Sequence, residues 1–323
     1  MRDLKQAADL LRKGGLVAFP TETVYGLGAD ARSTAAVMKI FRAKGRPATN
    51  PLIVHVTDAS VARRYVDWND RAEALAEQFW PGPLTLVLPR GDGLAAEVSA
   101  GLSSAGVRSP DHPMALALLR AFDGPVAAPS ANRSTHISPT TAEHVRAGLG
   151  DWVDLILDGG PCRVGIESTV LDLAGDEATI LRPGGVSRDK IEAIIGEVRL
   201  GATHTSEHAA QRSPGQQKIH YAPRTACFWF SPEERAEVKN WVQDRRTIWL
   251  ARDGQPNQPG AGECILPDDP VAYATRLYAA LHECDVMSMD LILIELPPDE
   301  SEWSAVRDRL TRAARYWREE ART

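Results

Sequence analysis

The segment Leu16-Val-Ala-Phe-Pro-Thr-Glu-Thr-Val-Tyr-Gly-Leu-Gly28 combines two features that recur along this chain, a short apolar strand and a polar loop directly after it. Its first four residues are apolar and run into Pro20, which predicts a short buried strand that stops there. Hydroxyl groups, one carboxylate and two glycines follow directly. Such a polar loop after a buried strand is unusual, and on its own it is a weak sign of a binding site.

Helices and strands alternate outward from this segment. A helix over residues 3–13 precedes it and ends at Gly14-Gly15, and Ser33 caps a second helix that ends at Lys44-Gly45. Further helices are expected at 70–79, 113–122, 140–148 and 187–195. Strands are expected at 51–56, 84–88, 106–108, 126–128, 153–157, 168–173 and 178–182. This mixture predicts an α/β domain over residues 1–198.

Residues 199–223 interrupt the alternation and are predicted to be a linker. Leu200 is the only large aliphatic residue between 199 and 218, so this stretch cannot bury enough apolar surface to fold alone. Beyond it the alternation restarts. Strands are expected at 226–230, 247–251 and 291–296, with helices at 232–243, 270–284 and 301–317. Residues 224–323 therefore form a smaller second α/β domain.

Composition excludes several classes of protein. With 323 residues, 43% hydrophobic and 25% charged, the chain is neither disordered nor fibrous. A net charge of −6 argues against a basic nucleic-acid-binding protein, although it leaves a local basic patch open. The four cysteines form no C-x-x-C pair, and neither a signal peptide nor an apolar run of roughly 18 residues occurs. A cytoplasmic protein that contacts no membrane is expected.

Lys44-Gly-Arg-Pro-Ala-Thr-Asn-Pro51 is a second unusual loop. A lysine and an arginine two residues apart can converge on phosphate oxygens, the arginine in a bidentate fashion. The alternative is a solvated loop whose cations complement a helix C-terminus, and taken alone that alternative is favoured.

Two more loops combine small and polar residues. Ala128-Pro-Ser-Ala-Asn132 follows a strand and lets a ligand approach the backbone, although a turn that bonds its own main chain is an alternative. Ser138-Pro139 reads as an N-cap followed by the first helical turn, and a helix start also suits an anion. The last loop, Gly165-Ile-Glu-Ser-Thr-Val170, precedes Arg182-Pro-Gly-Gly185.

Common nucleotide and hydrolase signatures are missing. The chain has no G-x-x-x-x-G-K-[ST], no G-x-G-x-x-G after a strand, no H-E-x-x-H and no G-x-S-x-G. A nucleotide site would have to be built in another way.

Taken in order, these segments resemble the YrdC-type threonylcarbamoyl-AMP synthases in their long, two-domain form. The matching segments cover about residues 5–195. They are Pro20–Gly28, Lys44–Pro47, Asn50–Leu52, Phe79–Thr85, Val107–His112, Pro129–Asn132 and Ser168–Val170. Ser213-Pro-Gly215 and His220-Tyr-Ala-Pro223 resemble the linker of that form, and Ala305–Ala314 resembles the end of its second domain. The linker departs from the family pattern between Gly215 and His220, and Thr135 stands where a glycine is expected.

The resemblance implies a YrdC-like α/β domain with a twisted mixed sheet and a concave site, followed by a small Rossmann-like α/β domain. It implies a nucleotidyltransferase that makes threonylcarbamoyl-AMP from L-threonine, bicarbonate and ATP and releases pyrophosphate, for tRNA modification. Mg²⁺ would be carried by ATP, with no metal ligands from the protein and no organic cofactor. The downstream partner would be the tRNA threonylcarbamoyl-transfer machinery.

The family's site residues carry over by motif. The L-threonine site would comprise Thr23, His55, Arg108, the Ala128 backbone and Ser168. The ATP site would comprise Lys44, Arg46, Asn50, Ser104, Ser130, Asn132, Ser138, Arg182 and Tyr221. Lys44 and Arg46 would stabilise charge on the phosphates, no residue is assigned as a general base, and the linker around Tyr221 would form a lid. From the residues alone, His55 reads as a core histidine, and Arg108 has Asp111 as an alternative ion-pair partner.

Two other functions stay open at this point. YrdC-type domains are reputed to bind double-stranded RNA or tRNA, so an RNA-binding module is one alternative. A carbamoyl-transfer enzyme of the hydrogenase-maturation type is another, although its zinc-binding cysteine motifs are absent. The arginines at 307, 309, 312, 315 and 318 invite an RNA interpretation, but their helical spacing beside acidic residues favours a solvated face.

Overall fold

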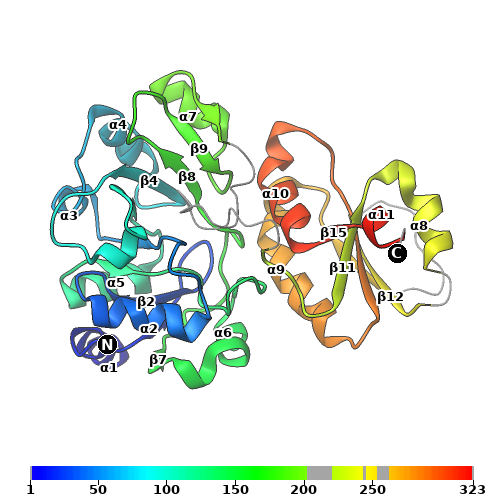
Figure 1. Cartoon of the computed structure of the whole chain (residues 1–323), viewed down its shortest axis with the longest axis horizontal. Coiled ribbons are helices and arrows are strands. Elements are labelled where there is room, and N and C mark those ends of the chain that lie inside the picture. The colour runs from blue at the N-terminus through cyan, green and yellow to red at the C-terminus, as the bar shows by residue number, and fades with distance from the viewer. Residues whose placement is uncertain (1, 202–219, 243–244, 253–261, 322–323) are drawn as a thin grey trace. The chain divides into compact units, whose positions relative to one another are not determined.

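The chain divides into two compact units in the computed structural model, which describes residues 2–201, 220–242, 245–252 and 262–321 (Figure 1). The first unit comprises residues 1–134 and 138–216, and the second comprises 135–137 and 217–323. Residues 202–219, which make up most of the predicted linker, lie outside the described residues. The boundaries at 198 and 224 stay predictions.

The first unit contains a mixed ten-stranded sheet in the order β10-β9-β8-β4-β5-β3-β6-β2-β1-β7. The strands are β1 Val17–Phe19, β2 Gly26–Asp30, β3 Ile53–His55, β4 Leu84–Pro89, β5 Ser104–Arg108, β6 Val126–Ala127, β7 Leu155–Ile156, β8 Thr169–Asp172, β9 Thr179–Arg182 and β10 Arg199–Leu200. The pairs β3–β5 and β4–β8 are parallel, whereas β1–β2 and β4–β5 are antiparallel. The predicted mixed α/β fold is confirmed.

Helices pack on this sheet and close its core. They are α1 Arg2–Arg12, α2 Thr34–Lys44, α3 Ala59–Ala62, α4 Asp70–Phe79, α5 Pro113–Phe122, α6 Ala142–Leu149 and α7 Arg188–Ile195, with 3₁₀ turns η1 Ala96–Ser99 and η2 Gly150–Trp152. The predicted boundaries of α4 and α5 are confirmed to the residue. As predicted, the Ser33 hydroxyl accepts a hydrogen bond from the Ala36 amide, and Gly45 ends α2 in the left-handed region.

Two strands of the first unit differ from expectation. β2 was expected to be loop, because Gly-Leu-Gly-Ala-Asp holds no β-branched residue, yet it pairs with β1. Gly28 has to be a glycine there, since a Cβ would lie 2.8 Å from the Phe19 ring and 2.9 Å from Val126 Cγ1. β10 begins within the predicted linker and pairs with β9, so residues 199–200 belong to the sheet.

The prediction that Ser138 caps a helix is wrong. Thr141 is the N-cap of α6, and its hydroxyl accepts from the His144 amide. Just before it, the Pro139 carbonyl accepts from the Tyr25 amide at 2.9 Å. The Ser138 hydroxyl donates to Glu167 Oε1 at 2.6 Å, so no helix start is available at Ser138 for an anion.

The second unit is built on a five-stranded sheet in the order β13-β12-β14-β11-β15. Its strands are β11 Ala226–Phe230, β12 Thr247–Arg252, β13 Gly262–Leu266, β14 Leu291–Glu295 and β15 Arg315–Tyr316, and every pair is parallel. Its helices are α8 Arg235–Trp241, α9 Pro270–Val286, α10 Ser304–Ala313 and α11 Trp317–Glu320, with turns η3 Pro232–Glu234 and η4 Ser301–Trp303. A parallel sheet with helical crossovers agrees with the expected Rossmann-like domain.

The end of this unit corrects two predictions. The expected helix over 301–317 stops at Ala313, because Arg315 and Tyr316 turn back to pair with β11, where the Tyr316 ring lies 4.6 Å from that of Trp229. The arginines of this region do not share one solvated face. Arg309 is fully buried and Arg312 is 5% exposed. Both pair with Asp308.

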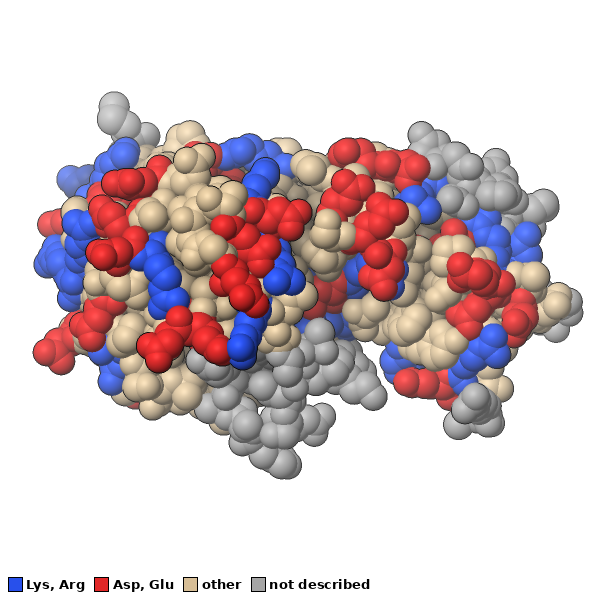
Figure 2. All heavy atoms as spheres, turned by 90° about the horizontal axis from the view of Figure 1, so that it is seen from above, with Lys and Arg blue, Asp and Glu red and all other residues tan. Residues whose placement is uncertain are grey.

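The surface and the helices give two further observations. Acidic and basic side chains are interspersed on the face in view in Figure 2. Within the described ranges, no helix combines the length and the apolar character that a membrane crossing requires.

Candidate active site

The loop between β1 and β2 is fixed by its own hydroxyl groups. Thr21 Oγ1 lies 2.8 Å from Thr23 Oγ1, donates to the Val24 carbonyl at 2.6 Å and accepts from the Val24 amide at 3.2 Å. Thr21, Glu22 and Thr23 are all at most 2% exposed. The short polar sequence after Pro20 thus folds as a closed turn that points its side chains into the unit.

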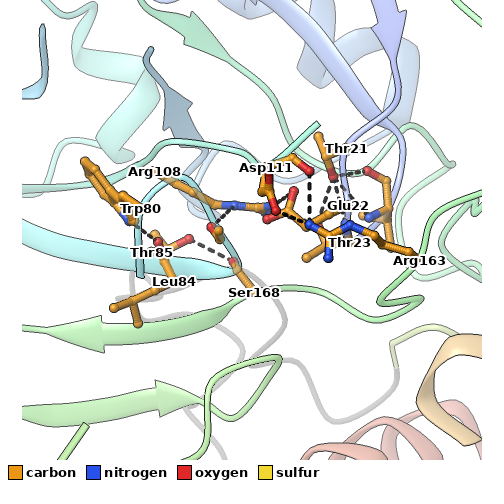
Figure 3. Close-up of polar contacts among 12 residues, drawn as sticks. Thr21, Glu22, Thr23, Trp80, Leu84, Thr85, Arg108, Asp111, Arg163 and Ser168 are labelled. Atoms are coloured by element: carbon orange, nitrogen blue, oxygen red, sulfur yellow. Dashed lines mark hydrogen bonds and ion pairs between the residues drawn. The ribbon is translucent and has the colours of Figure 1, made fainter. Parts of the chain in front are cut away.

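Arg108, at the end of β5, lies against this loop (Figure 3). Its Nε donates to the Gly82 carbonyl at 3.2 Å and its Nη1 to Thr23 Oγ1 at 3.0 Å. Its Nη2 lies 2.6 Å from Glu22 Oε2. The alternative ion pair with Asp111 is wrong, because Asp111 pairs with Arg163 instead.

Ser168 lies on the other side of Arg108 in Figure 3, just before β8. Its hydroxyl is 2.8 Å from Thr85 Oγ1 on the neighbouring strand β4. Arg182, at the end of β9, donates to the Ser168 carbonyl from Nε at 3.2 Å and from Nη2 at 3.0 Å. Arg182, predicted to contact ATP, thus braces a residue predicted to contact threonine.

His55 and Ala128 complete this group of predicted threonine contacts. In the parallel pair β3–β5, His55 lies opposite Arg108, and its ring meets Phe19 edge-on at 6.0 Å. Burial, followed by the nearby Arg108 charge, lowers the pKa of His55 to about 3, so the imidazole is neutral near pH 7. The Ala128 amide donates to the Ile53 carbonyl at 2.9 Å.

Lys44 joins two predicted ATP motifs. As the last residue of α2 it points its ammonium at the 130–132 loop, where Nζ donates to the carbonyls of Ser130, at 2.6 Å, and Asn132. It also reaches Asn132 Oδ1, which accepts from the Ser130 hydroxyl as well. Burial, and secondarily the charge of Arg46, hold the pKa of Lys44 well below its usual range. A solvated lysine is therefore excluded.

Arg46 is buried as well, at 7% exposure. Its Nε donates to the Asn50 carbonyl at 3.1 Å, and its Nη2 donates to the Pro51 carbonyl at 2.8 Å and to Asn50 Oδ1. The loop after α2 is thus folded around its own guanidinium. The alternative of a solvated loop is wrong for both cations.

The remaining predicted ATP residues are Ser104, Ser138 and Tyr221. Ser104 begins β5, at the opposite end from Arg108, and Ser138 is bound to Glu167. Tyr221 belongs to the second unit, where its ring lies 5.7 Å from that of Tyr278 and 5.4 Å from the guanidinium of Arg309.

Thr135 shows why a glycine was expected at its position. Its φ of 69° lies in the left-handed region, which costs little only for glycine. Residues 135–137 group with the second unit, and the Thr135 carbonyl accepts from the Ala222 amide at 2.8 Å.

Sequence reasoning missed two parts of this site. Glu22 was noted only as the carboxylate of its loop, and Thr85 only as a strand residue, yet they contact Arg108 and Ser168. A clue to Glu22 was available, because a carboxylate in a segment that is otherwise apolar and hydroxyl-bearing needs a buried cation as its partner. The described residues contain no group of three or more His, Cys, Asp or Glu side chains arranged to hold a metal ion.

Known proteins match the chain over nearly its whole length. The family described as "Telomere recombination" matches residues 9–184, and "Threonylcarbamoyl-AMP synthase, C-terminal domain" matches residues 186–315. The threonylcarbamoyl-AMP synthase of Bacillus subtilis is 42% identical over 320 residues, which cover 96% of this chain and 92% of the relative. This chain belongs to the threonylcarbamoyl-AMP synthase family.

The match to two family domains makes it a synthase of the long, two-domain form and an enzyme of the nucleotidyltransferase type. The synthase of Pyrococcus abyssi is 39% identical over 323 residues, which cover 97% of this chain and 94% of the relative. A crystal structure of P. abyssi Sua5 complexed with L-threonine matches with a TM-score of 0.90 at 38% identity, covering 97% of this chain and 94% of that one. The architecture of both units is therefore that of a known synthase.

Proposed function

We propose that this synthase condenses L-threonine, bicarbonate and ATP into L-threonylcarbamoyl-AMP and releases pyrophosphate, the first step of threonylcarbamoyladenosine formation in tRNA. The observation that carries the proposal is the similarity, over nearly the whole chain, to a relative crystallised with L-threonine. A cytoplasmic location, and transfer of the product by downstream tRNA threonylcarbamoyl-transfer machinery, remain predictions that follow from this function.

L-Threonine is proposed to bind where Arg108 lies between Thr23 and Ser168. The contacts of Arg108 leave an N–H on each terminal nitrogen, and such a pair can bind a carboxylate in bidentate fashion. The hydroxyls of Thr23 and Ser168 can reach the substrate hydroxyl. His55 adds a buried, uncharged wall, and the Ala128 backbone is the remaining proposed contact.

ATP is proposed to bind at the two buried cations. Lys44 Nζ, now held by the carbonyls of the 130–132 loop, can exchange one of them for a phosphate oxygen, and Arg46 can stabilise charge as pyrophosphate leaves. Further proposed ATP contacts are Asn50, Ser104, Ser130, Asn132, Ser138, Arg182 and Tyr221. Mg²⁺ enters as part of the ATP substrate and offsets phosphate charge there. We expect the linker around Tyr221 to close over the bound substrates.

In this reaction the protein positions the substrates and forms no covalent bond with them. The threonine ammonium first releases a proton to solvent, and the resulting amine takes up bicarbonate to form a carbamate and water. A carbamate oxygen attacks the α-phosphorus of ATP, a new P–O bond forms, and the bond to the β-phosphate oxygen breaks. No residue is assigned as a general base.

Pyrophosphate release from Mg²⁺-ATP tests this function directly. Release should require both bicarbonate and L-threonine, with serine and valine as controls that lack the methyl or the hydroxyl group. No release from folded protein would overturn the proposal and favour a binding module. Titration with tRNA and double-stranded RNA at two salt concentrations would then measure that alternative.

A further inference from the structure

Glu22 and Arg108 form an ion pair that is almost completely removed from water. The Glu22 side chain is fully buried, the Arg108 side chain is 4% exposed, and the charged groups are 2.6 Å apart. Two such charges are costly to bury, and removal of either one leaves the other uncompensated. None of the threonine or ATP contacts predicted from the sequence uses this carboxylate.

The pair is held from several directions, yet some of its buried polar atoms have no hydrogen-bond partner among the described residues. Arg108 is fixed by Gly82 and Thr23, and the Glu22 turn by the hydrogen bonds of Thr21. Neither oxygen of Glu22 accepts a hydrogen bond from the described residues, and the 2.6 Å ion contact with Arg108 is made by Oε2. Glu22 Oε1 and the remaining N–H groups of Arg108 can therefore meet a ligand.

Charge decides what kind of ligand fits. A plain carboxylate on Arg108 would leave two buried carboxylates sharing one guanidinium, which is unfavourable at short range. A ligand that carries a carboxylate and an ammonium on the same carbon restores two positive and two negative charges. The pair is thus complementary to an α-amino acid in its zwitterionic form.

We propose that Glu22 and Arg108 form a paired-charge subsite in which Arg108 binds the α-carboxylate of the substrate and Glu22 binds its α-ammonium. This inference rests on the proposed function, because it states which charged group of L-threonine each side chain binds in the proposed site. It makes Glu22 the residue that rejects carboxylic acids without an amino group. Glu22 would also orient the bound substrate, with the α-amino group facing the Glu22 carboxylate and not the Arg108 guanidinium.

The test compares L-threonine with 2,3-dihydroxybutanoate, the analogue in which a hydroxyl replaces the amino group, by calorimetric titration of the full-length protein. Wild-type protein should bind threonine at least 10-fold more tightly. Glu22→Gln should weaken threonine binding about 10- to 100-fold, the loss of one charged hydrogen bond. It should also leave dihydroxybutanoate bound as tightly as before or more tightly, because the competing negative charge is gone.

Glu295→Gln is the matched control. Glu295 is also buried against an arginine, Arg235, but on β14 of the second unit. It should leave the ratio of the two affinities unchanged. Glu22→Asp, which keeps the charge, should recover part of the selectivity.

Equal loss of both ligands in Glu22→Gln would overturn the proposal and reduce Glu22 to a positioning residue for Arg108. Should that variant fail to fold, the wild-type comparison decides, because equal affinity for the two ligands contradicts the subsite. The proposed function fails separately, if wild-type protein binds threonine selectively but releases no pyrophosphate.

Discussion

Replacing Gly184 by alanine measures how closely the chain that follows β9 supports the proposed threonine site. A Cβ at this position would lie 2.4 Å from the Glu167 carbonyl oxygen, the Ser168 carbonyl carbon and the Thr169 nitrogen. Ordinary contact begins near 3.4 Å, and all three are backbone atoms, so residues 167–169 would have to withdraw by about 1 Å.

That displacement sets the size of the effect. Overpacking costs about 1–3 kcal/mol. The Ser168 contacts to Thr85, at 2.8 Å, and to Arg182, at 3.0 Å, would weaken as well. Loss of one such hydrogen bond costs about 1 kcal/mol, so we expect destabilisation by about 2–4 kcal/mol. A shift of about 1 Å in a group that positions substrate can lower kcat/KM about 100-fold.

Urea denaturation and the kcat/KM for threonine check this expectation. Gly175→Ala is the control, because a Cβ there meets nothing within 4 Å. Its free energy of unfolding should stay within about 0.5 kcal/mol of the wild-type value. If Gly184→Ala matched Gly175→Ala in both its midpoint and its kinetics, the reasoning would be refuted.

Three further predictions concern single side chains. Lys44→Met should lower pyrophosphate release at least about 100-fold, because the ammonium proposed to stabilise phosphate charge is gone. The circular dichroism spectrum should stay native, since the carbonyl oxygens left without a donor cost about 1–3 kcal/mol each and removal of a buried charge offsets part of that loss. Wild-type turnover would contradict this prediction. Because the pKa of His55 is about 3 in the folded chain and near 6.5 when unfolded, its unfolded form binds the extra proton, so wild type should lose about 2 kcal/mol as the pH falls from 7 to 5. His55→Asn should lose less over this range, and equal shifts in the urea midpoint would argue against this. Thr135→Gly should stabilise the second unit by about 0.5–1 kcal/mol. The left-handed conformation costs threonine about 1–2 kcal/mol, and the greater conformational entropy that glycine loses on folding offsets part of this gain. A lower thermal midpoint would show that the strain is absent.

Local signals predicted the regular parts of the fold. The helices α4 and α5 combine apolar spacing with N-caps at Asn69 and His112, and their observed ends coincide with the expected ones. β2 and β15 carried no such signal. β2 is glycine-rich and β15 is only two residues long, so tertiary pairing decides both.

The candidate site was also predictable from the sequence only in part. Motif order pointed to Lys44, Arg46 and Arg108 as candidate site residues, because the motifs of the family occur in the same order along this chain. It said nothing of their partners, since Arg108 and Thr23 are 85 residues apart and meet only when β1, β2 and β5 are in one sheet. Burial of both cations was likewise unpredictable, because a Lys-x-Arg loop is solvated in most proteins and only packing reverses that preference.

Residues 135–137 make the second unit discontinuous in sequence, since they group with residues 217–323 and Ala222 bonds and bridges to them. A chimaera joined at a single point near residue 217 would therefore combine one protein's segment 135–137 with another protein's second unit. We expect such a chimaera to keep the native pairing between these segments only when residues 135–137 are exchanged together with the C-terminal part.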